Sequence, residues 1–500
     1  MKITGDRTAT PRARGIIVYL VLLAAGFAVY SEALGHPFMQ NWDDEWYVTQ
    51  NETVRGLTAD HLKRAFTEVC VANYAPVHLI SYMIDFELTP ARDRSPLSPF
   101  MFHLTNYLLH VTAAWLVYRL ARAYNLADGA AALAAAVFLV HPLQVETVAW
   151  VAERKNILFV LFSLGAWLAY LRSRETGRNG WVAASLGFFV LALFSKSHAV
   201  VLAAVLPAHE YFFPRPGESR LNVLRRLTPY IVLAVVAGCI SIGLQWKGAE
   251  ETYYENAPLR IALTSPVIFS KYLALTAYPT HLSALYDVPA VMTLTDTRGW
   301  IGMAVTAGFG VLLIYLAVRR HQLGFWMWVY LAALAPVLQI VPMTTPMNDR
   351  YLYFSMIGAG VVAGLALWPK PGTAGFGRVI RSAAAIVLVI ALAGLSRKQV
   401  DVWESPLTLW SHAAGEFPAS GRVQEKYGEA FFMLGKYADA IERLDRASAM
   451  RYDRAGTLLY RGRAFRAIGQ FDDARENFRR LGEEKRYQEL ARQELARTPN

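Results

Sequence analysis

Eleven apolar blocks in this 500-residue chain constrain its fold more than any other feature. The blocks have roughly 16–22 residues, about the length at which an α-helix crosses the hydrocarbon layer of a membrane. Because 54% of the residues are hydrophobic and 18% are charged, the chain is predicted to be an all-α, polytopic membrane protein. The blocks lie at 15–34, 101–122, 129–148, 155–172, 180–195, 198–213, 227–246, 300–318, 324–341, 351–369 and 377–396.

The basic residues predict the orientation of the chain. The formal net charge is +11, but lysines and arginines fall in short loops between apolar blocks, so they indicate topology and not a nucleic-acid partner. A further apolar segment at 262–285 contains prolines and Lys271. If it spanned, Arg319 and Arg320 would be placed outside, against the positive-inside rule. We therefore expect about eleven spans, with 262–285 interfacial or re-entrant, the N-terminus inside and the C-terminus outside.

This orientation places several polar stretches on one outer face. The largest is a loop at 35–100, in which 57–66 and 76–88 have the spacing of amphipathic helices lying along a membrane surface. The other outer stretches are 141–156, 195–198, 245–257, 286–299 and 346–350.

A second domain is predicted at 399–500, after a transmembrane domain at 1–398. It is rich in arginine, glutamate, alanine and glycine, and a set of small and aromatic residues recurs at a period of 34. This period is typical of tetratricopeptide repeats, in which small residues lie where two helices cross. About two and a half repeats are near the minimum for a stable stack, so the domain is either a partner-binding module or a spacer. The recurring residues are Gly428, Ala430, Gly435, Tyr437 and Ala440, then Gly462, Ala464, Gly469, Phe471 and Ala474.

Three consecutive carboxylates, Asp43, Asp44 and Glu45, follow the first apolar block between Trp42 and Trp46. Carboxylates at a membrane boundary are costly to desolvate. The cluster indicates either a general base or metal ligand, or an ordinary interfacial loop with an aromatic belt. Consecutive loop residues make a poor cation cage, so no metal or other cofactor is predicted, although such oxygen ligands are compatible with Mg²⁺ or Mn²⁺.

Charged residues in the other outer stretches complement these acids. Glu146 and Arg154 lie in the 141–156 stretch. Lys196 lies between two apolar blocks with almost no loop, and Arg350 precedes the tenth block. Each has an ordinary explanation, such as snorkelling or anchoring a helix end. Together, carboxylates and cations on one face are suited to a group-transfer reaction. A carboxylate activates a hydroxyl nucleophile, and the cations stabilise the phosphate leaving group of the other substrate.

Several short motifs follow one another along most of the chain. They are Trp42-Asp43-Asp44, His141-Pro142 with Glu146-Thr147-Val148-Ala149 and Arg154, Ser195-Lys196, Asp349-Arg350-Tyr351-Leu352-Tyr353, and the repeats after the last span. In this order, the motifs resemble those of the transmembrane and tetratricopeptide-repeat O-mannosyltransferases, within the GT-C glycosyltransferases that use lipid-linked sugars.

The resemblance implies a GT-C-like fold with its active site on the non-cytoplasmic face. It implies transfer of a hexose such as mannose from a polyprenyl-phosphate donor, with inversion at the anomeric carbon. The acceptors would be Ser or Thr hydroxyls of secreted or envelope proteins, presented by the repeat domain. Membrane lipids would surround the chain, and the expected location is a bacterial inner membrane with the active face and the repeats in the periplasm.

The resemblance also implies roles for individual residues. Asp43 or Asp44 would be the general base, and the prediction places it at Asp44 with Asp43 orienting it, although the sequence does not separate them. The implied phosphate-binding residues are Arg350, Lys196 and Arg154, and the implied positioning residues are Glu146 and His141.

Three other functions compete with this one. In the first, the enzyme uses the same donor but a glycolipid or polysaccharide acceptor, and the repeats only recruit partners. A transporter or flippase-like assembly factor would show polar residues in mid-span and symmetry between halves, whereas the charge here concentrates at one face. An inactive scaffold built on the repeats is disfavoured by the intact Asp43-Asp44 pair.

Overall fold

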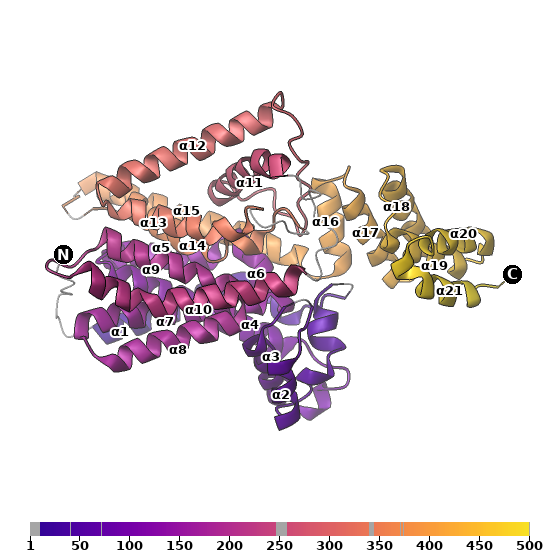
Figure 1. Ribbon diagram of the computed structural model, residues 1–500, viewed down its shortest axis with the longest axis horizontal. Helices are drawn as coiled ribbons and strands as arrows, with labels where there is room; N and C mark the ends of the chain where they lie inside the picture. Colours follow the sequence, from indigo (N-terminus) through magenta and orange to yellow (C-terminus); the bar gives the residue numbers. More distant parts are fainter. Residues whose placement is uncertain are drawn as a thin grey trace. The chain divides into compact units, whose positions relative to one another are not determined.

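The structure, a computed structural model, describes residues 11–40, 42–71, 73–246, 258–339, 345–370, 372–373 and 375–499 (Figure 1). The described residues form helices joined by turns, with no β-strand beyond two isolated bridges. They divide into two compact units. The first unit comprises Met1–Phe38, Asp43–Leu282 and Val288–Asp401, and the second comprises Met39–Trp42, Ser283–Asp287 and Val402–Asn500.

Each predicted apolar block contains an α-helix, which confirms the all-α fold class. In the first unit α7 packs against α8 and α4, and α5 packs against α14 (Figure 1). The helices of the blocks are α1 (Pro11–Tyr30), α4 (Phe100–Ala123), α5 (Asp128–Val140), α6 (Val145–Ala149), α7 (Arg154–Thr176), α8 (Asn179–Ser195), α9 (Leu202–Phe212), α10 (Arg220–Trp246), α12 (Thr297–Val318), α13 (Gln322–Leu334), α14 (Ser355–Leu367) and α15 (Gly375–Val402).

Several of these helices are long and apolar enough to cross a membrane. Within the part of the chain that the structure describes, five qualify, at Ala13–Tyr30, Val151–Thr176, Arg220–Gly243, Thr297–Val318 and Gly375–Val402. The pair Asp128–Val140 and Pro142–Ala149, bent by 54°, adds a sixth if it forms one span. Shorter apolar helices lie at Asn179–Ser195, Gln322–Val337 and Ser355–Leu367. The finding supports a multi-pass membrane protein, while the number of about eleven spans and their orientation stay predictions.

Segment 262–285 begins inside a helix, α11 (Pro258–Ala277), which contains Pro266. This helix is not among the five long apolar helices, and its interfacial or re-entrant placement stays a prediction. The outer stretch predicted at 245–257 lies outside the described residues from 247 onward.

The two amphipathic helices predicted in the 35–100 loop are confirmed as helices. In α2 (Ala59–Thr67), the Thr58 side chain caps the N-terminus by accepting a hydrogen bond from the His61 N–H at 3.1 Å. In α3 (Pro76–Leu88), proline occupies the first turn, where no N–H is needed. Shorter turns in and beside this loop are η1 (Glu32–Gly35), η2 (Glu45–Thr49), η3 (Glu52–Val54) and η4 (Ala91–Asp93).

Small residues allow the helices of the first unit to approach closely. A Cβ atom at Gly360 of α14 would lie 2.7 Å from the carbonyl oxygen of Ala134 in α5. Only glycine fits at that distance, a pattern typical of helix pairs packed in membranes.

The second unit contains helices that recur with the predicted period. The starts of α17 and α19, and those of α18 and α20, are 34 residues apart. α17 packs against α18, and α19 against α20 (Figure 1). The helices are α16 (Pro406–Glu416), α17 (Gly421–Met433), α18 (Tyr437–Ala449), α19 (Ala455–Ala467), α20 (Phe471–Leu481), η10 (Lys485–Tyr487) and α21 (Gln488–Ala496).

The recurring glycines have physical roles in these pairs. A Cβ atom at Gly428 would lie 2.6 Å from the Leu444 side chain, and one at Gly462 would lie 2.6 Å from Phe478. Helix crossing therefore requires glycine at both positions. Gly435 and Gly469 have φ of +71° and +82° in the turns between paired helices, a conformation that glycine adopts without strain. The assignment of these pairs to the tetratricopeptide class stays a prediction.

Candidate functional site

The acidic stretch after the first helix folds into an unusual turn. Asp44 precedes η2 (Glu45–Thr49), a single turn of π-helix. The Tyr47 N–H donates to the Asp43 carbonyl at 2.9 Å, and the Gln50 N–H donates to the Glu45 carbonyl at 2.8 Å. Single π-turns are rare and frequently occur at functional sites, so the loop has a defined backbone instead of an open interfacial form.

The two aspartates of this loop have different surroundings. Asp44 is 1% exposed, and its Oδ1 accepts a hydrogen bond from the backbone N–H of Ala152 at 2.7 Å. Asp43 and Glu45 are only half-buried. The structure therefore anchors Asp44 to the turn η6 (Val151–Glu153) and leaves Asp43 more accessible.

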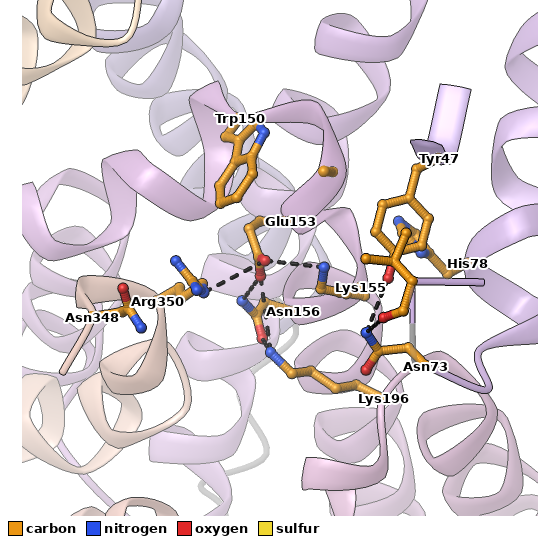
Figure 2. Close-up of polar contacts among 12 residues, drawn as sticks. Tyr47, Asn73, His78, Trp150, Glu153, Lys155, Asn156, Lys196, Asn348 and Arg350 are labelled. Carbon is orange, nitrogen blue, oxygen red and sulfur yellow. Dashed lines mark hydrogen bonds and ion pairs between the residues drawn. The ribbon is translucent and has the colours of Figure 1, made fainter. Parts of the chain in front are cut away.

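The same turn supplies Glu153, which lies at the centre of a group of cations (Figure 2). The Glu153 carboxylate is 3.0 Å from Lys155 Nζ, 3.8 Å from Lys196 Nζ and 3.5 Å from Arg350 Nε. Its side chain is 2% exposed. Three cations from three separate segments therefore converge on one buried carboxylate, and we refer to Glu153, Lys155, Lys196 and Arg350 as the Glu153 cluster.

Asn156 links two members of the cluster. Its Nδ2 donates to Glu153 Oε2 at 2.5 Å, and its Oδ1 accepts from Lys196 Nζ at 2.6 Å (Figure 2). Lys196 lies between α8 and the turn η7 (Ser197–Val201). Burial lowers the pKa of Lys196 to about 8, against the opposing effect of the Glu153 charge. Lys196 is therefore a cation whose charge is lost just above neutral pH.

Arg350 is held in place by Glu146. The Arg350 backbone N–H donates to Glu146 Oε2 at 2.9 Å, and its guanidinium pairs with Glu146 Oε1. The guanidinium carbon is also 5.5 Å from the ring centres of Trp150 and Tyr351. Burial opposes the charge of Arg350, but the neighbouring glutamates outweigh it and raise the pKa of Arg350. Arg350 is therefore a fixed cation on the turn η9 (Asp349–Leu352).

Tyr47 connects the acidic loop to the cluster. Lys155 Nζ lies 4.7 Å from the centre of the Tyr47 ring, and Asn73 Nδ2 donates to the Tyr47 hydroxyl at 3.1 Å (Figure 2). Burial raises the pKa of Tyr47 to about 12, with the Lys155 charge opposing this shift and the Asp43 charge adding to it. Lys155 and Asp43 thus act on the same hydroxyl, and the predicted base region lies beside the cations.

Arg154 lies outside this cluster. Its side chain is fully buried and pairs with Asp85 of α3. Its Nε donates to Asn106 Oδ1 at 2.6 Å, while its terminal nitrogens donate to the carbonyls of Ser81 at 3.1 Å and Phe102 at 2.7 Å. Each nitrogen of the guanidinium is therefore engaged in joining α3, α4 and α7.

His141 also makes contacts outside the cluster. Its Nδ1 accepts from the Leu143 N–H at 3.3 Å and caps the turn η5 (Pro142–Gln144). Its Nε2 is 3.2 Å from the carbonyl oxygen of Thr276 in α11. The contacts of His141 therefore position the backbone.

Of the residues predicted as a site, the structure brings together Glu146, Lys196 and Arg350. Sequence reasoning did not predict Glu153 or Lys155 as members of the site. Successive helical residues point about 100° apart, so Arg154 and Lys155 have different partners. Among the described residues, no group of three or more His, Cys, Asp or Glu side chains is arranged to hold a metal ion.

No protein-family model matches the chain. Curated relatives do match it. The protein O-mannosyl-transferase F38B6.6 of Caenorhabditis elegans is 20% identical over 87% of this chain and 63% of its own length. The human protein O-mannosyl-transferase TMTC3 is 20% identical over 81% of this chain and 48% of its own. The mouse protein O-mannosyl-transferase TMTC1 is 26% identical over 44% of this chain and 25% of its own.

These matches confirm the resemblance to the transmembrane and tetratricopeptide-repeat O-mannosyltransferases. The chain spans between about half and two thirds of the length of the first two relatives. A solved structure, the archaeal oligosaccharyltransferase AglB from Archaeoglobus fulgidus with an inhibitory peptide and a dolichol-phosphate, aligns with 79% of this chain and 56% of its own. The identity is 13% and the TM-score is 0.43.

Proposed function

We propose that this relative of the transmembrane O-mannosyltransferases is a membrane glycosyltransferase with a GT-C-like fold. It moves a hexose such as mannose from a polyprenyl-phosphate donor to Ser or Thr hydroxyls of secreted or envelope proteins, with inversion. The observation that carries the proposal is the convergence of Lys155, Lys196 and Arg350 on the turn that also anchors Asp44.

The Glu153 cluster fits the phosphate of a lipid-linked sugar. Three cations surround Glu153, and one of them, Arg350, also pairs with Glu146. When the glycosidic bond breaks, negative charge grows on the departing phosphate, and preorganised cations stabilise it most at that stage. Arg350 is suited to two parallel hydrogen bonds with phosphate oxygens, whereas each lysine acts as a point charge.

The Asp43–Asp44 pair supplies the general base in this proposal. A general base must reach the acceptor hydroxyl within hydrogen-bonding distance. Because Asp44 is 1% exposed and bonded to Ala152, its contacts favour a role in fixing the loop. The half-buried Asp43 is then the better placed base. This division is the reverse of the one expected from the sequence, which could not separate the two carboxylates.

The inverting step involves one bond formed and one broken. Asp43 takes the proton of the acceptor hydroxyl as its oxygen attacks the anomeric carbon from the face opposite the phosphate. The bond from that carbon to the phosphate oxygen breaks, and polyprenyl phosphate leaves with the electron pair. Lys155, Lys196 and Arg350 hold the phosphate as its charge increases.

The cluster lies at the start of α7 and next to the turns after α8 and before α14, where a donor anchored by its lipid chain presents its phosphate. In the proposed topology this face, with the second unit, lies in the periplasm of a bacterial inner membrane. The second unit then presents the protein acceptor.

The reaction class is tested by transfer of radiolabelled mannose from polyprenyl-phosphate-mannose to extracted envelope proteins. Polyprenyl-phosphate-glucose and GDP-mannose serve as comparison donors. We expect label on protein only with a lipid-linked donor and purified enzyme. Labelling from GDP-mannose alone would contradict the proposed donor. Donor turnover in which the label enters only lipid or polymer would contradict the proposed acceptor.

A further inference from the structure

The buried face of α3 carries three polar side chains. His78, Tyr82 and Asp85 are spaced four and three residues apart, so they share one face of the helix. Each is at most 1% exposed. Buried polar groups are costly unless each finds a partner, and Asp85 has its partner in Arg154. The face that α3 turns toward the first unit therefore makes directed polar contacts in addition to apolar packing.

Tyr82 links this face to the turn η6. Its hydroxyl donates to the carbonyl oxygen of Val151 at 2.6 Å. Because a tyrosine hydroxyl has only one proton, the 2.7 Å contact between Tyr82 and His78 Nε2 has the histidine as its donor. Burial, and next the Lys155 charge, lowers the pKa of His78 well below its usual value. The histidine is therefore neutral at pH 7 with its proton on Nε2, and the relay from His78 through Tyr82 to Val151 has one direction.

The two residues after Val151 hold the two parts of the proposed site. The Ala152 N–H donates to Asp44 at 2.7 Å, and the Glu153 carboxylate binds the three cations of the cluster (Figure 2). The turn has three residues, each at most 2% exposed. A displacement of the Val151 carbonyl would therefore move both neighbours. All of these residues, and α3, belong to the first unit.

We propose that Tyr82 is a positioning residue for the transfer reaction, because its bond to the Val151 carbonyl fixes the η6 turn and with it Asp44 and the Glu153 carboxylate. Buried polar contacts of this kind set one geometry where apolar packing would permit several. This inference rests on the proposed function. It differs from a purely structural role, in which loss of the Tyr82 hydroxyl would lower stability without changing the turn.

The test uses the full-length protein with Tyr82→Phe, and with Tyr230→Phe as the matched control. Both tyrosines are fully buried, and the Tyr230 hydroxyl donates to Ser185 Oγ at 2.7 Å, which joins α10 to α8. Tyr82→Phe removes one oxygen and keeps the ring, whose centre lies 4.5 Å from the guanidinium carbon of Arg154. Both variants are therefore expected to fold, with similar decreases in the thermal unfolding midpoint.

Amide hydrogen exchange at Ala152 reports the turn directly. We expect exchange there to be about 3- to 10-fold faster in Tyr82→Phe, because one hydrogen bond that holds the turn is lost. The donor kcat/KM in the mannose-transfer assay is expected to fall by about the same factor. In Tyr230→Phe, both quantities are expected to stay as in wild type.

The pH dependence of the donor kcat/KM is a readout that a loss of stability alone would not move. Burial lowers the pKa of Lys196, and the Glu153 charge partly opposes this effect. The other charges that act on Lys196 are those of Lys155, Arg350 and Glu146. A turn that no longer holds Glu153 near Lys196 weakens the opposing effect, so the decline in kcat/KM as Lys196 loses its proton is expected at lower pH in Tyr82→Phe. It is expected at the wild-type pH in Tyr230→Phe.

Unchanged exchange at Ala152, or an unchanged pH dependence, in folded Tyr82→Phe protein would overturn the inference. Equal changes in Tyr82→Phe and Tyr230→Phe would also overturn it, because they would indicate a general loosening of the helices. Wild-type protein without transfer activity would overturn the proposed function, whereas the exchange at Ala152 would still decide whether Tyr82 fixes the turn.

Discussion

Glu146 accepts hydrogen bonds from both the backbone N–H and the guanidinium of Arg350, although the two residues are 204 positions apart in the chain. This contact joins α6 to η9, the turn before α14. It fixes the backbone as well as the charge of Arg350, so Arg350 presents its remaining donors in one orientation. In the proposed function, Glu146 is therefore a positioning residue for the phosphate site.

Replacing Arg350 with lysine tests the phosphate role. Lysine keeps a positive charge near Glu146 but cannot form two parallel bonds to a phosphate. One charge-assisted hydrogen bond contributes about 1.5–3 kcal/mol, so we expect the donor KM to rise about tenfold or more while the acceptor KM stays constant. Arg350→Ala is a poorer probe, because a buried glutamate without its partner costs about 3–5 kcal/mol of stability. Equal effects on donor and acceptor would remove Arg350 from the phosphate site.

The pH dependence of donor use follows from Lys196. With a pKa of about 8, Lys196 carries its charge below that pH and loses it above. We expect kcat/KM for the donor to fall as pH rises through about 8, because this ratio reports the ionisation of the free enzyme. In Lys196→Arg the charge persists, so the decline near pH 8 should be absent. A decline that persists in Lys196→Arg would assign it to another group.

Asparagine variants of the two aspartates separate the base from the anchor. Loss of a general base typically costs about 10²–10⁴ in rate. We expect Asp43→Asn to lower kcat by this amount while the thermal unfolding midpoint and the affinity for polyprenyl phosphate stay as in wild type. Asp44→Asn is expected to lower kcat less and the unfolding midpoint more, because it alters the buried contact with Ala152. The opposite order would place the base at Asp44.

Arg154 is expected to contribute to stability and not to donor binding. Its guanidinium is fully buried and engaged with Asp85, Asn106 and two backbone carbonyls. Arg154→Lys keeps the charge but loses several of these bonds, and we expect a lower unfolding midpoint with the donor KM of the folded protein unchanged. A stable Arg154→Lys protein with a raised donor KM would return Arg154 to the phosphate site.

The helical architecture could be predicted from the sequence because hydrophobic block length reports helices directly. The 34-residue recurrence was equally visible, and the structure explains it by close crossings at Gly428 and Gly462 and left-handed turns at Gly435 and Gly469. The number of spans is harder to predict. Several apolar blocks form helices too short to cross a membrane on length alone, such as α9, which has 11 residues.

The site was only partly predictable. Glu146, Lys196 and Arg350 stood out because charges at the edge of apolar blocks need partners, but nothing in the local sequence indicates which distant partner each one finds. Glu153 was not predicted as a site residue, and it pairs with Lys155 and Lys196 because of the break between α6 and α7 at Trp150. Which of two adjacent carboxylates is anchored also depends on a contact 108 residues away, the Ala152 amide.

The most direct test of the account is the equilibrium binding of polyprenyl phosphate to wild type, Lys155→Gln and Glu153→Gln. Arg319→Gln, an exposed arginine that lies over Tyr315, is the control. We predict weaker binding by about tenfold or more for Lys155→Gln, because one charge-assisted contact is lost. We predict tighter binding for Glu153→Gln, because the phosphate no longer competes with a carboxylate for the same cations, and no change for Arg319→Gln. Equal affinity in all four proteins would contradict the claim that the Glu153 cluster holds the donor phosphate.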